Sequence, residues 1–100
     1  MEKLLENLEF APDHPGKKLL YNSDNMRVVR FCLKAGQEIE PHTVVPEVLM
    51  LALQGKGVFT VGEKKFDVSA GSMVVCRSNE AHGIKAREDL VVMAVIAPSP

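Results

Sequence analysis

Short hydrophobic runs, several of which alternate between hydrophobic and polar residues, recur along the chain from residue 26 onward, and turn-forming residues separate them. The runs cover residues 26–33, 48–53, 58–61, 66–68, 73–77, 83–86 and 90–97. A period of two is typical of β-strands, and short strands at close spacing are typical of an antiparallel sandwich or barrel. We therefore predict an all-β fold.

Two of these runs predict how the sheet packs. In 26–33, the face expected to form the core carries Val29, Phe31 and Leu33. The opposite face, expected to meet water, carries Arg30, Cys32 and Lys34. Residues 48–53 are apolar on both faces, which is typical of a central strand whose outer face is also covered. We expect a homodimer, because a large exposed apolar face is rare in monomers.

The chain is expected to be one domain over residues 1–100, with an N-terminal arm and loop over 1–25 and a barrel over 26–97. Apolar residues near the start fit a short helix or an extended arm, and we favour the arm; they are Leu4, Leu5, Leu8 and Phe10. His14 lies among prolines, where a histidine is usually solvated. Pro98 ends the last strand, since proline supplies no ladder donor.

Composition excludes several classes of partner. A chain of 100 residues with 46% hydrophobic content suffices for one core. Its 12 basic and 13 acidic residues are scattered, which argues against nucleic acid or an anionic membrane as a partner. No apolar run approaches the roughly twenty residues of a membrane span, and the start lacks a signal-peptide pattern. We therefore expect a cytoplasmic protein in which Cys32 and Cys76 are reduced.

Two isolated histidines in glycine-punctuated stretches are the main candidates for chemistry. His42 lies between Gly36 and Gly55, and His82 follows Gly71. Either histidine alone is most simply a buried residue with satisfied hydrogen bonds. As a pair, they are interpreted as two halves of one binding site.

With these stretches, residues 26–97 resemble the cupin family, whose fold is a double-stranded β-helix or jelly roll. The first motif of that family has a glycine, two histidines, a glutamate and a closing glycine, and it matches here at Gly36, His42 and Gly55. Val44 stands at the second histidine position and Val48 at the glutamate position, while Glu47 falls one residue early.

The second motif matches at Gly71 and His82. Arg77 replaces its proline, Asn79 its second glycine and Ala86 its asparagine. Asn79 is a fitting substitute, because asparagine tolerates the left-handed backbone conformation. These departures leave the fold assignment intact and reduce the set of metal ligands.

The resemblance implies that His42 and His82 meet at the barrel mouth and bind a divalent transition metal, with zinc, manganese, iron, nickel or copper as candidates. Such sites usually take three or four protein donors. Glu47 could be a third ligand if a bulge near Pro46 turned it inward, and the plainer interpretation is a carboxylate in water. The expected walls of the pocket are Val44, Val48, Met50 and Cys76, of which the cysteine is either a thiolate ligand or a packing residue.

Three hypotheses follow. The first is a metal-binding protein whose pocket also takes a small molecule, and it predicts a metal that copurifies. The second is a metal-free module that binds a small organic ligand through the two histidines, and it predicts affinity that survives chelation. The third is a sensory or stability module that acts as a homodimer. The residues select no substrate, reaction, catalytic residue or organic cofactor.

Overall fold

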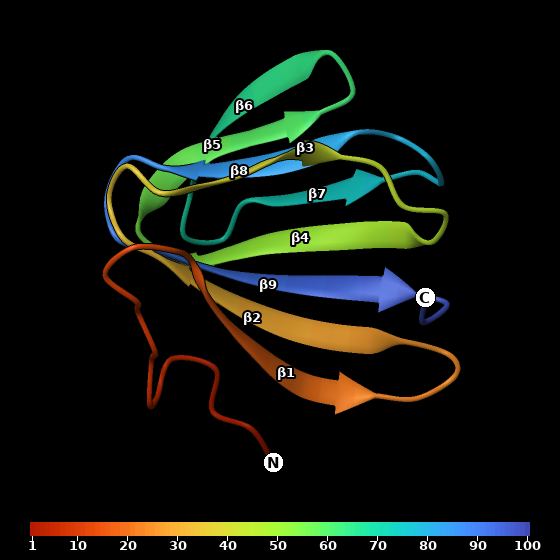
Figure 1. The fold of residues 1–100 in the computed structure, drawn as a ribbon, viewed down its shortest axis with the longest axis horizontal. Helices are drawn as coiled ribbons and strands as arrows, with labels where there is room; N and C mark the ends of the chain where they lie inside the picture. Colours follow the sequence, from red (N-terminus) through yellow and green to blue (C-terminus); the bar gives the residue numbers. More distant parts are fainter.

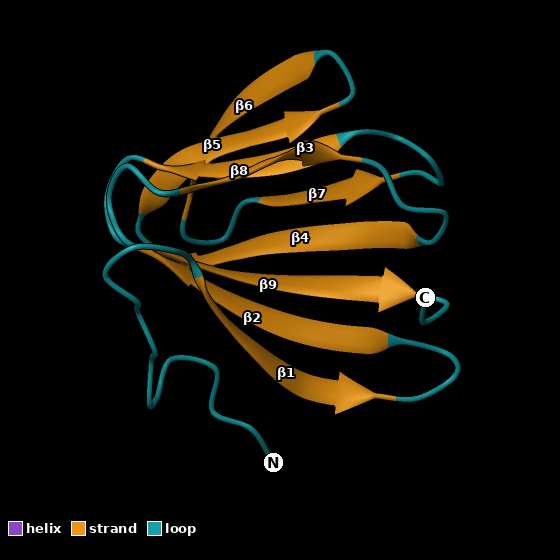
Figure 2. Ribbon diagram, viewed as in Figure 1, coloured by secondary structure: helices purple, strands orange, loops and turns teal.

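The structure, a computed structural model, describes residues 1–100 and contains nine β-strands and no helix (Figure 1). The strands are β1 (Gly16–Asn22), β2 (Arg27–Leu33), β3 (Glu38–His42), β4 (Glu47–Gln54), β5 (Lys56–Val61), β6 (Lys64–Ser69), β7 (Met73–Cys76), β8 (His82–Ala86) and β9 (Leu90–Ala97). They form a five-stranded sheet, β1-β2-β9-β4-β7, and a four-stranded sheet, β3-β8-β5-β6 (Figure 2). The prediction of an all-β fold is confirmed. No helix suited to crossing a bilayer is present.

Each predicted run is a strand with similar bounds, and two further strands were not predicted. Both of these, β1 and β3, lie at a sheet edge. Edge strands are partly solvated, so their sequences alternate poorly, and the proline in β3 is tolerated because it lies at an edge. The sandwich therefore extends through β1 into the segment that the sequence assigns to arm and loop.

The inner face of the five-stranded sheet is built from cross-strand rows. Arg27, Ile96 and Val48 form one row across β2, β9 and β4. The next row along the same strands is Val29, Ala94 and Met50. Further rows belong to the core, whose fully buried residues include Leu33, Phe59, Leu90 and Val92.

Arg30 and Cys32, on the outer face of β2, do not meet water, contrary to the sequence prediction. Arg30 is 3% exposed and Cys32 is 2% exposed. The N-terminal arm covers this part of the face, because the Arg30 guanidinium donates hydrogen bonds to the carbonyl oxygens of Leu4 (3.3 Å), Glu6 (3.0 Å) and Asn7 (3.0 Å). Alternation assigned these residues to the outer face correctly, but it carries no information about the arm that covers them.

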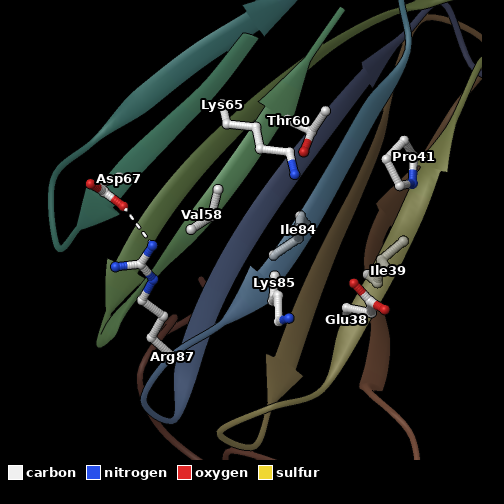
Figure 3. Close-up of a pocket in the computed structure, with 10 residues that line it drawn as sticks. All are labelled: Glu38, Ile39, Pro41, Val58, Thr60, Lys65, Asp67, Ile84, Lys85 and Arg87. Atoms are coloured by element: carbon white, nitrogen blue, oxygen red, sulfur yellow. Dashed lines mark ion pairs between the residues drawn. The ribbon is translucent and has the colours of Figure 1, made fainter. Parts of the chain in front are cut away.

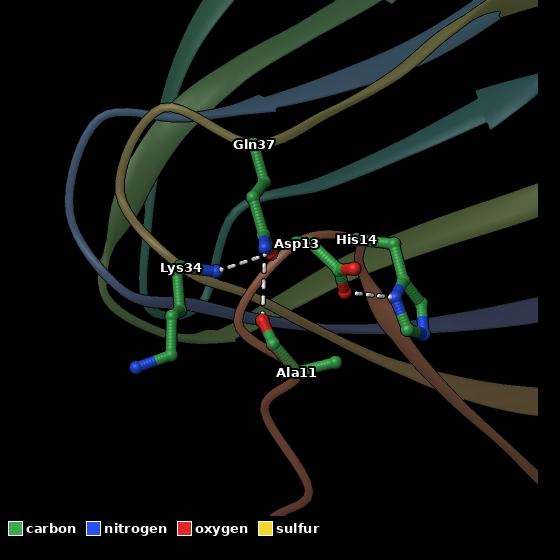
Figure 4. Close-up of polar contacts among 5 residues, drawn as sticks. All are labelled: Ala11, Asp13, His14, Lys34 and Gln37. Atoms are coloured by element: carbon green, nitrogen blue, oxygen red, sulfur yellow. Dashed lines mark hydrogen bonds and ion pairs between the residues drawn. The ribbon is translucent and has the colours of Figure 1, made fainter.

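The arm contains no helix, but it is not extended throughout: residues 4–7 form a turn in which the Glu6 N–H donates to the Lys3 carbonyl oxygen (3.2 Å). Side chains near its junction with β1 anchor it (Figure 4). The Gln37 amide donates to the Ala11 carbonyl oxygen (2.9 Å) and accepts from the Lys34 N–H (2.8 Å). His14 is exposed, with Nδ1 2.7 Å from the Asp13 carboxylate, and this hydrogen bond lowers the pKa of Asp13. His14 is therefore a solvated residue remote from the core.

Candidate functional site

His42 and His82 lie side by side at the start of a cavity between the two sheets. His42 ends β3, His82 begins β8, and the antiparallel ladder pairs them directly. Their ring centroids are 4.5 Å apart, with 53° between the ring planes. Both rings line a cavity of about 210 Å³. The structure thus brings together the two histidines that the sequence singles out.

A bulge in β3 turns His42 toward this cavity. The ladder between β3 and β8 pairs Ile39 with Ile84 and then His42 with His82, so β3 contains one extra residue over this interval. Without that residue, alternation would place Ile39 and His42 on opposite faces. With it, both side chains line the cavity.

A backbone carbonyl two residues earlier orients each imidazole ring. Nδ1 of His42 lies 3.0 Å from the Glu40 carbonyl oxygen, and Nδ1 of His82 lies 3.2 Å from the Glu80 carbonyl oxygen. A carbonyl oxygen can only accept, so Nδ1 carries the proton, and the neutral ring has its lone pair at Nε2. Neither Nε2 atom has a hydrogen-bond partner in the protein.

Burial favours the neutral form of the inner ring. His82 is only 7% exposed. Desolvation lowers its pKa, the Glu80 carbonyl opposes this effect, and the neighbouring His42 adds to it. The Nε2 lone pair of His82 is therefore available at neutral pH.

Most of the cavity wall is apolar. It includes three of the residues expected from the sequence, Val44, Val48 and Met50. Sequence reasoning missed several others that complete the wall, among them Val29, Phe31, Ile39, Ile84, Ala94 and Ile96. Those on β2 and β9 lie on the inner face of their strands, as alternation predicts. Their position at the cavity depends on how the two sheets pack against each other, which the sequence pattern does not give.

Glu47 lies outside the cavity. The ladder between β4 and β9 is regular from Glu47 to Ala52, so Glu47 takes the face opposite to that of Val48. Its side chain is exposed and borders a separate open depression near Pro98. The structure does not bring this carboxylate to the two histidines.

Cys76 is fully buried in the core and does not line the cavity. Burial, together with the nearby Glu80 carboxylate, raises the pKa of this thiol to about 11. It is therefore a protonated thiol at neutral pH, and both cysteines are free. No group of three or more His, Cys, Asp or Glu side chains is placed to hold a metal ion.

Two cations that sequence reasoning missed, Lys17 and Arg27, also line the cavity. Arg27 begins β2 and, by the alternation of a strand, its side chain lies on the same inner face as Val29 and Phe31. This alternation could have predicted from the sequence that Arg27 faces the interior. The lining contains no aspartate or glutamate. The titratable side chains of the cavity are therefore two cations and two histidines.

A larger depression of about 530 Å³ lies against the four-stranded sheet (Figure 3). Its side chains come from β3, β5, β6 and β8 and from the turn after β8, and they mix both signs of charge. Arg87 pairs with Asp67 at 3.2 Å, and both side chains are largely exposed. This depression is a solvated groove without a buried polar group.

Comparison with known proteins agrees with this architecture. The model of the cupin domain matches residues 29–97. A crystal structure of an RmlC-like cupin protein from Desulfovibrio desulfuricans is 31% identical and has a TM-score of 0.91, covering 98% of this chain and 95% of that one. A comparison with curated protein sequences gives no match.

Two more distant structures share the fold. The TT1209 protein from Thermus thermophilus is 22% identical with a TM-score of 0.94, covering 100% of this chain and 98% of that one. A conserved protein with a double-stranded β-helix domain from Klebsiella pneumoniae is 19% identical with a TM-score of 0.89, covering 98% of this chain and 89% of that one. The family match, the 31% identity over nearly the whole chain and the jelly-roll topology lead to one conclusion: this chain belongs to the cupin family.

Proposed function

We propose that this cupin binds a small molecule in the cavity between its sheets, with His42 and His82 as the polar end of the site. The observation that carries the proposal is the shared orientation of the two rings. Both Nδ1 atoms are held by carbonyl oxygens, which leaves two Nε2 lone pairs on adjacent rings that line the same cavity. A small apolar cavity with a few convergent polar groups is the usual form of a ligand site.

We further propose that the two Nε2 atoms hold a divalent transition metal. Histidines that bind metals commonly donate their other ring N–H to a carbonyl or carboxylate, which is the arrangement of both rings here. Imidazole suits zinc, copper, iron and nickel better than manganese. A bound metal would act as a Lewis acid toward the ligand. With two protein donors, its remaining positions would be left to water or to the ligand itself.

A metal-free site is the second candidate, and the shortage of donors favours it. Neither Glu47 nor Cys76 reaches the histidines, and no third donor stands near them. In this case each Nε2 accepts a hydrogen bond from a hydroxyl or N–H group of the ligand. Ligand binding would then survive removal of metal.

Elemental analysis by plasma mass spectrometry, on protein purified without an affinity tag or chelator, separates the two candidates. Metal near one equivalent, retained in His14→Ala and lost in both His42→Ala and His82→Ala, supports the metal site. Absence of metal after reconstitution with zinc, copper, iron, nickel and manganese contradicts it. A screen of small molecules against chelated protein then tests the cavity itself, and failure of every ligand in both states would refute the proposed function.

A further inference from the structure

We propose that the cavity selects a small organic carboxylate, whose anionic group is anchored by Arg27 with Lys17 as a second cation. This inference rests on the proposed function, because it names the class of ligand for the same cavity. It is carried by a guanidinium that has no partner in the protein and by the charge of the cavity lining.

The Arg27 side chain is half-buried, and its Nε atom is fully buried without a hydrogen-bond partner. The Nε atom of Arg30 is also buried without a partner, but the terminal nitrogens of Arg30 donate to three carbonyl oxygens, whereas no protein group forms a hydrogen bond or ion pair with any atom of the Arg27 guanidinium. Buried polar groups in folded proteins nearly always have a partner. The guanidinium of Arg27 is thus a planar fork of donors left for something outside the chain.

The permanently charged side chains of the cavity lining are all cationic. Lys17 and Arg27 are its only permanently charged side chains, since it contains no aspartate or glutamate. Neither cation takes part in any of the three ion pairs of the protein. An anion that enters the cavity would therefore meet two cationic side chains that have no ion-pair partner, and no aspartate or glutamate side chain.

The arrangement of the rows gives the ligand its shape. Arg27 stands in a row with Ile96 and Val48, and the next row is wholly apolar, with Val29, Ala94 and Met50. Successive rows on one face are about 7 Å apart, and packed sheets are about 10 Å apart. An anionic group at Arg27 therefore places an attached apolar body over the next row, facing the histidines of the opposite sheet.

The size of the cavity limits the ligand further. At about 210 Å³ it is smaller than the usual range for drug-sized ligands. A bulky phosphorylated metabolite would not be enclosed, while a short aliphatic or single-ring acid would be. A carboxylate also matches the two parallel N–H donors of an arginine.

Isothermal titration calorimetry with matched acids and amides tests the assignment. The probes are acetate, butyrate and benzoate, paired with acetamide, butyramide and benzamide, on the full chain both as purified and after chelation. We expect at least one acid to bind tenfold or more tighter than its amide in both states, since a charged hydrogen bond is worth about that much. The chelated sample excludes a preference that comes from metal alone.

Variants assign the preference to the arginine. Arg27→Gln should remove it, Arg27→Lys should retain part of it, and Lys17→Gln should weaken it. Arg77→Gln, in the exposed loop after β7, is the matched control and should behave as the wild type. Circular dichroism establishes that each variant is folded, and Lys17→Gln keeps the test decisive if Arg27→Gln does not fold.

Several results would overturn the inference while leaving the proposed function intact. They are amides that bind as tightly as their acids, and an acid preference that survives in folded Arg27→Gln. Inorganic phosphate that binds more tightly than every acid would likewise overturn the choice of a carboxylate. Failure of all probes, together with failure of the wider ligand screen, would refute the proposed function as well.

Discussion

His42 and His82 present the same nitrogen to the cavity from very different surroundings. His42 is exposed and comes from an edge strand, while His82 is 7% exposed and comes from a strand inside the four-stranded sheet. In both, the carbonyl two residues earlier fixes the tautomer. Burial therefore favours the neutral form of the inner ring, and the outer ring is the one that solvent and ligands reach first.

Acidification should destabilise the fold through His82. Burial lowers the pKa of this ring in the folded state, so the unfolded chain takes up a proton at higher pH than the folded chain does. The resulting stability is complete above the ordinary value of 6.5 and is lost as the pH falls below it. Between about pH 8 and pH 5, urea titrations should show a larger decrease in the free energy of unfolding for the wild type than for His82→Gln.

The same titrations on His14→Gln serve as the control, because His14 is exposed. The free energy of unfolding of His14→Gln should decrease on acidification by as much as that of the wild type. Equal losses in the wild type and His82→Gln would show that His82 has the same pKa in both states.

At the scale of elements, the site depends on the bulge that β3 forms against β8. Gly83, next to His82, lies under this bulge: a Cβ atom there would stand 2.9 Å from the Pro41 nitrogen and 3.0 Å from the Ile39 carbonyl oxygen. Both contacts are with backbone, which cannot move aside without shifting β3. The close approach of the two strands, and hence the pairing of the histidines, requires glycine at this position.

Gly83→Ala should therefore push the two histidine strands apart. We expect a loss of about 1–3 kcal/mol in the free energy of unfolding, typical of overpacking, together with loss of metal or ligand from the cavity. Gly71→Ala is the control: its added Cβ meets no atom within 4 Å, but its φ of +95° makes alanine costly there. It should lose stability and keep full binding, whereas unchanged binding in Gly83→Ala would contradict the role given to the bulge.

The sequence predicted the strands whose apolar residues face the core. It missed the strands and contacts that depend on other parts of the chain. β4 and β9 alternate or are apolar throughout, so they were predicted, while the edge strands β1 and β3 carry no such signal. The burial of Arg30 depends on an arm more than twenty residues away in sequence. The two histidines followed from motif spacing, but Arg27 emerged only when the stacking of the sheets placed it at the cavity.

At the scale of the whole molecule, the outer face of the five-stranded sheet carries exposed apolar side chains. One cross-strand row on it consists of Tyr21, Val28, Val95, Leu49 and Val75. Tyr21 is 52% exposed, Val75 is 49% exposed and Met73, in the adjacent row, is 56% exposed. The outer face of β4, which the sequence predicts to be covered, is thus part of an apolar strip that crosses all five strands.

We propose that a second copy of the chain covers this strip in a symmetric dimer, because the strip offers the same apolar surface to each partner. Light scattering coupled to size exclusion should give a dimer for the wild type and a monomer for Val75→Glu. Phe66→Glu, which places the same charge on an exposed position of the other sheet, should remain dimeric. A monomeric wild type at micromolar concentration would contradict the proposal.

The most direct test of the paired-histidine site is a long-range ¹H–¹⁵N correlation spectrum of the histidine rings, recorded before and after addition of Zn²⁺. His42 and His82 should both carry the proton on Nδ1, and zinc should shift both Nε2 signals together while His14 stays unchanged. A proton on Nε2 of either ring, or zinc that perturbs one ring alone, would contradict a shared site at the mouth of the barrel.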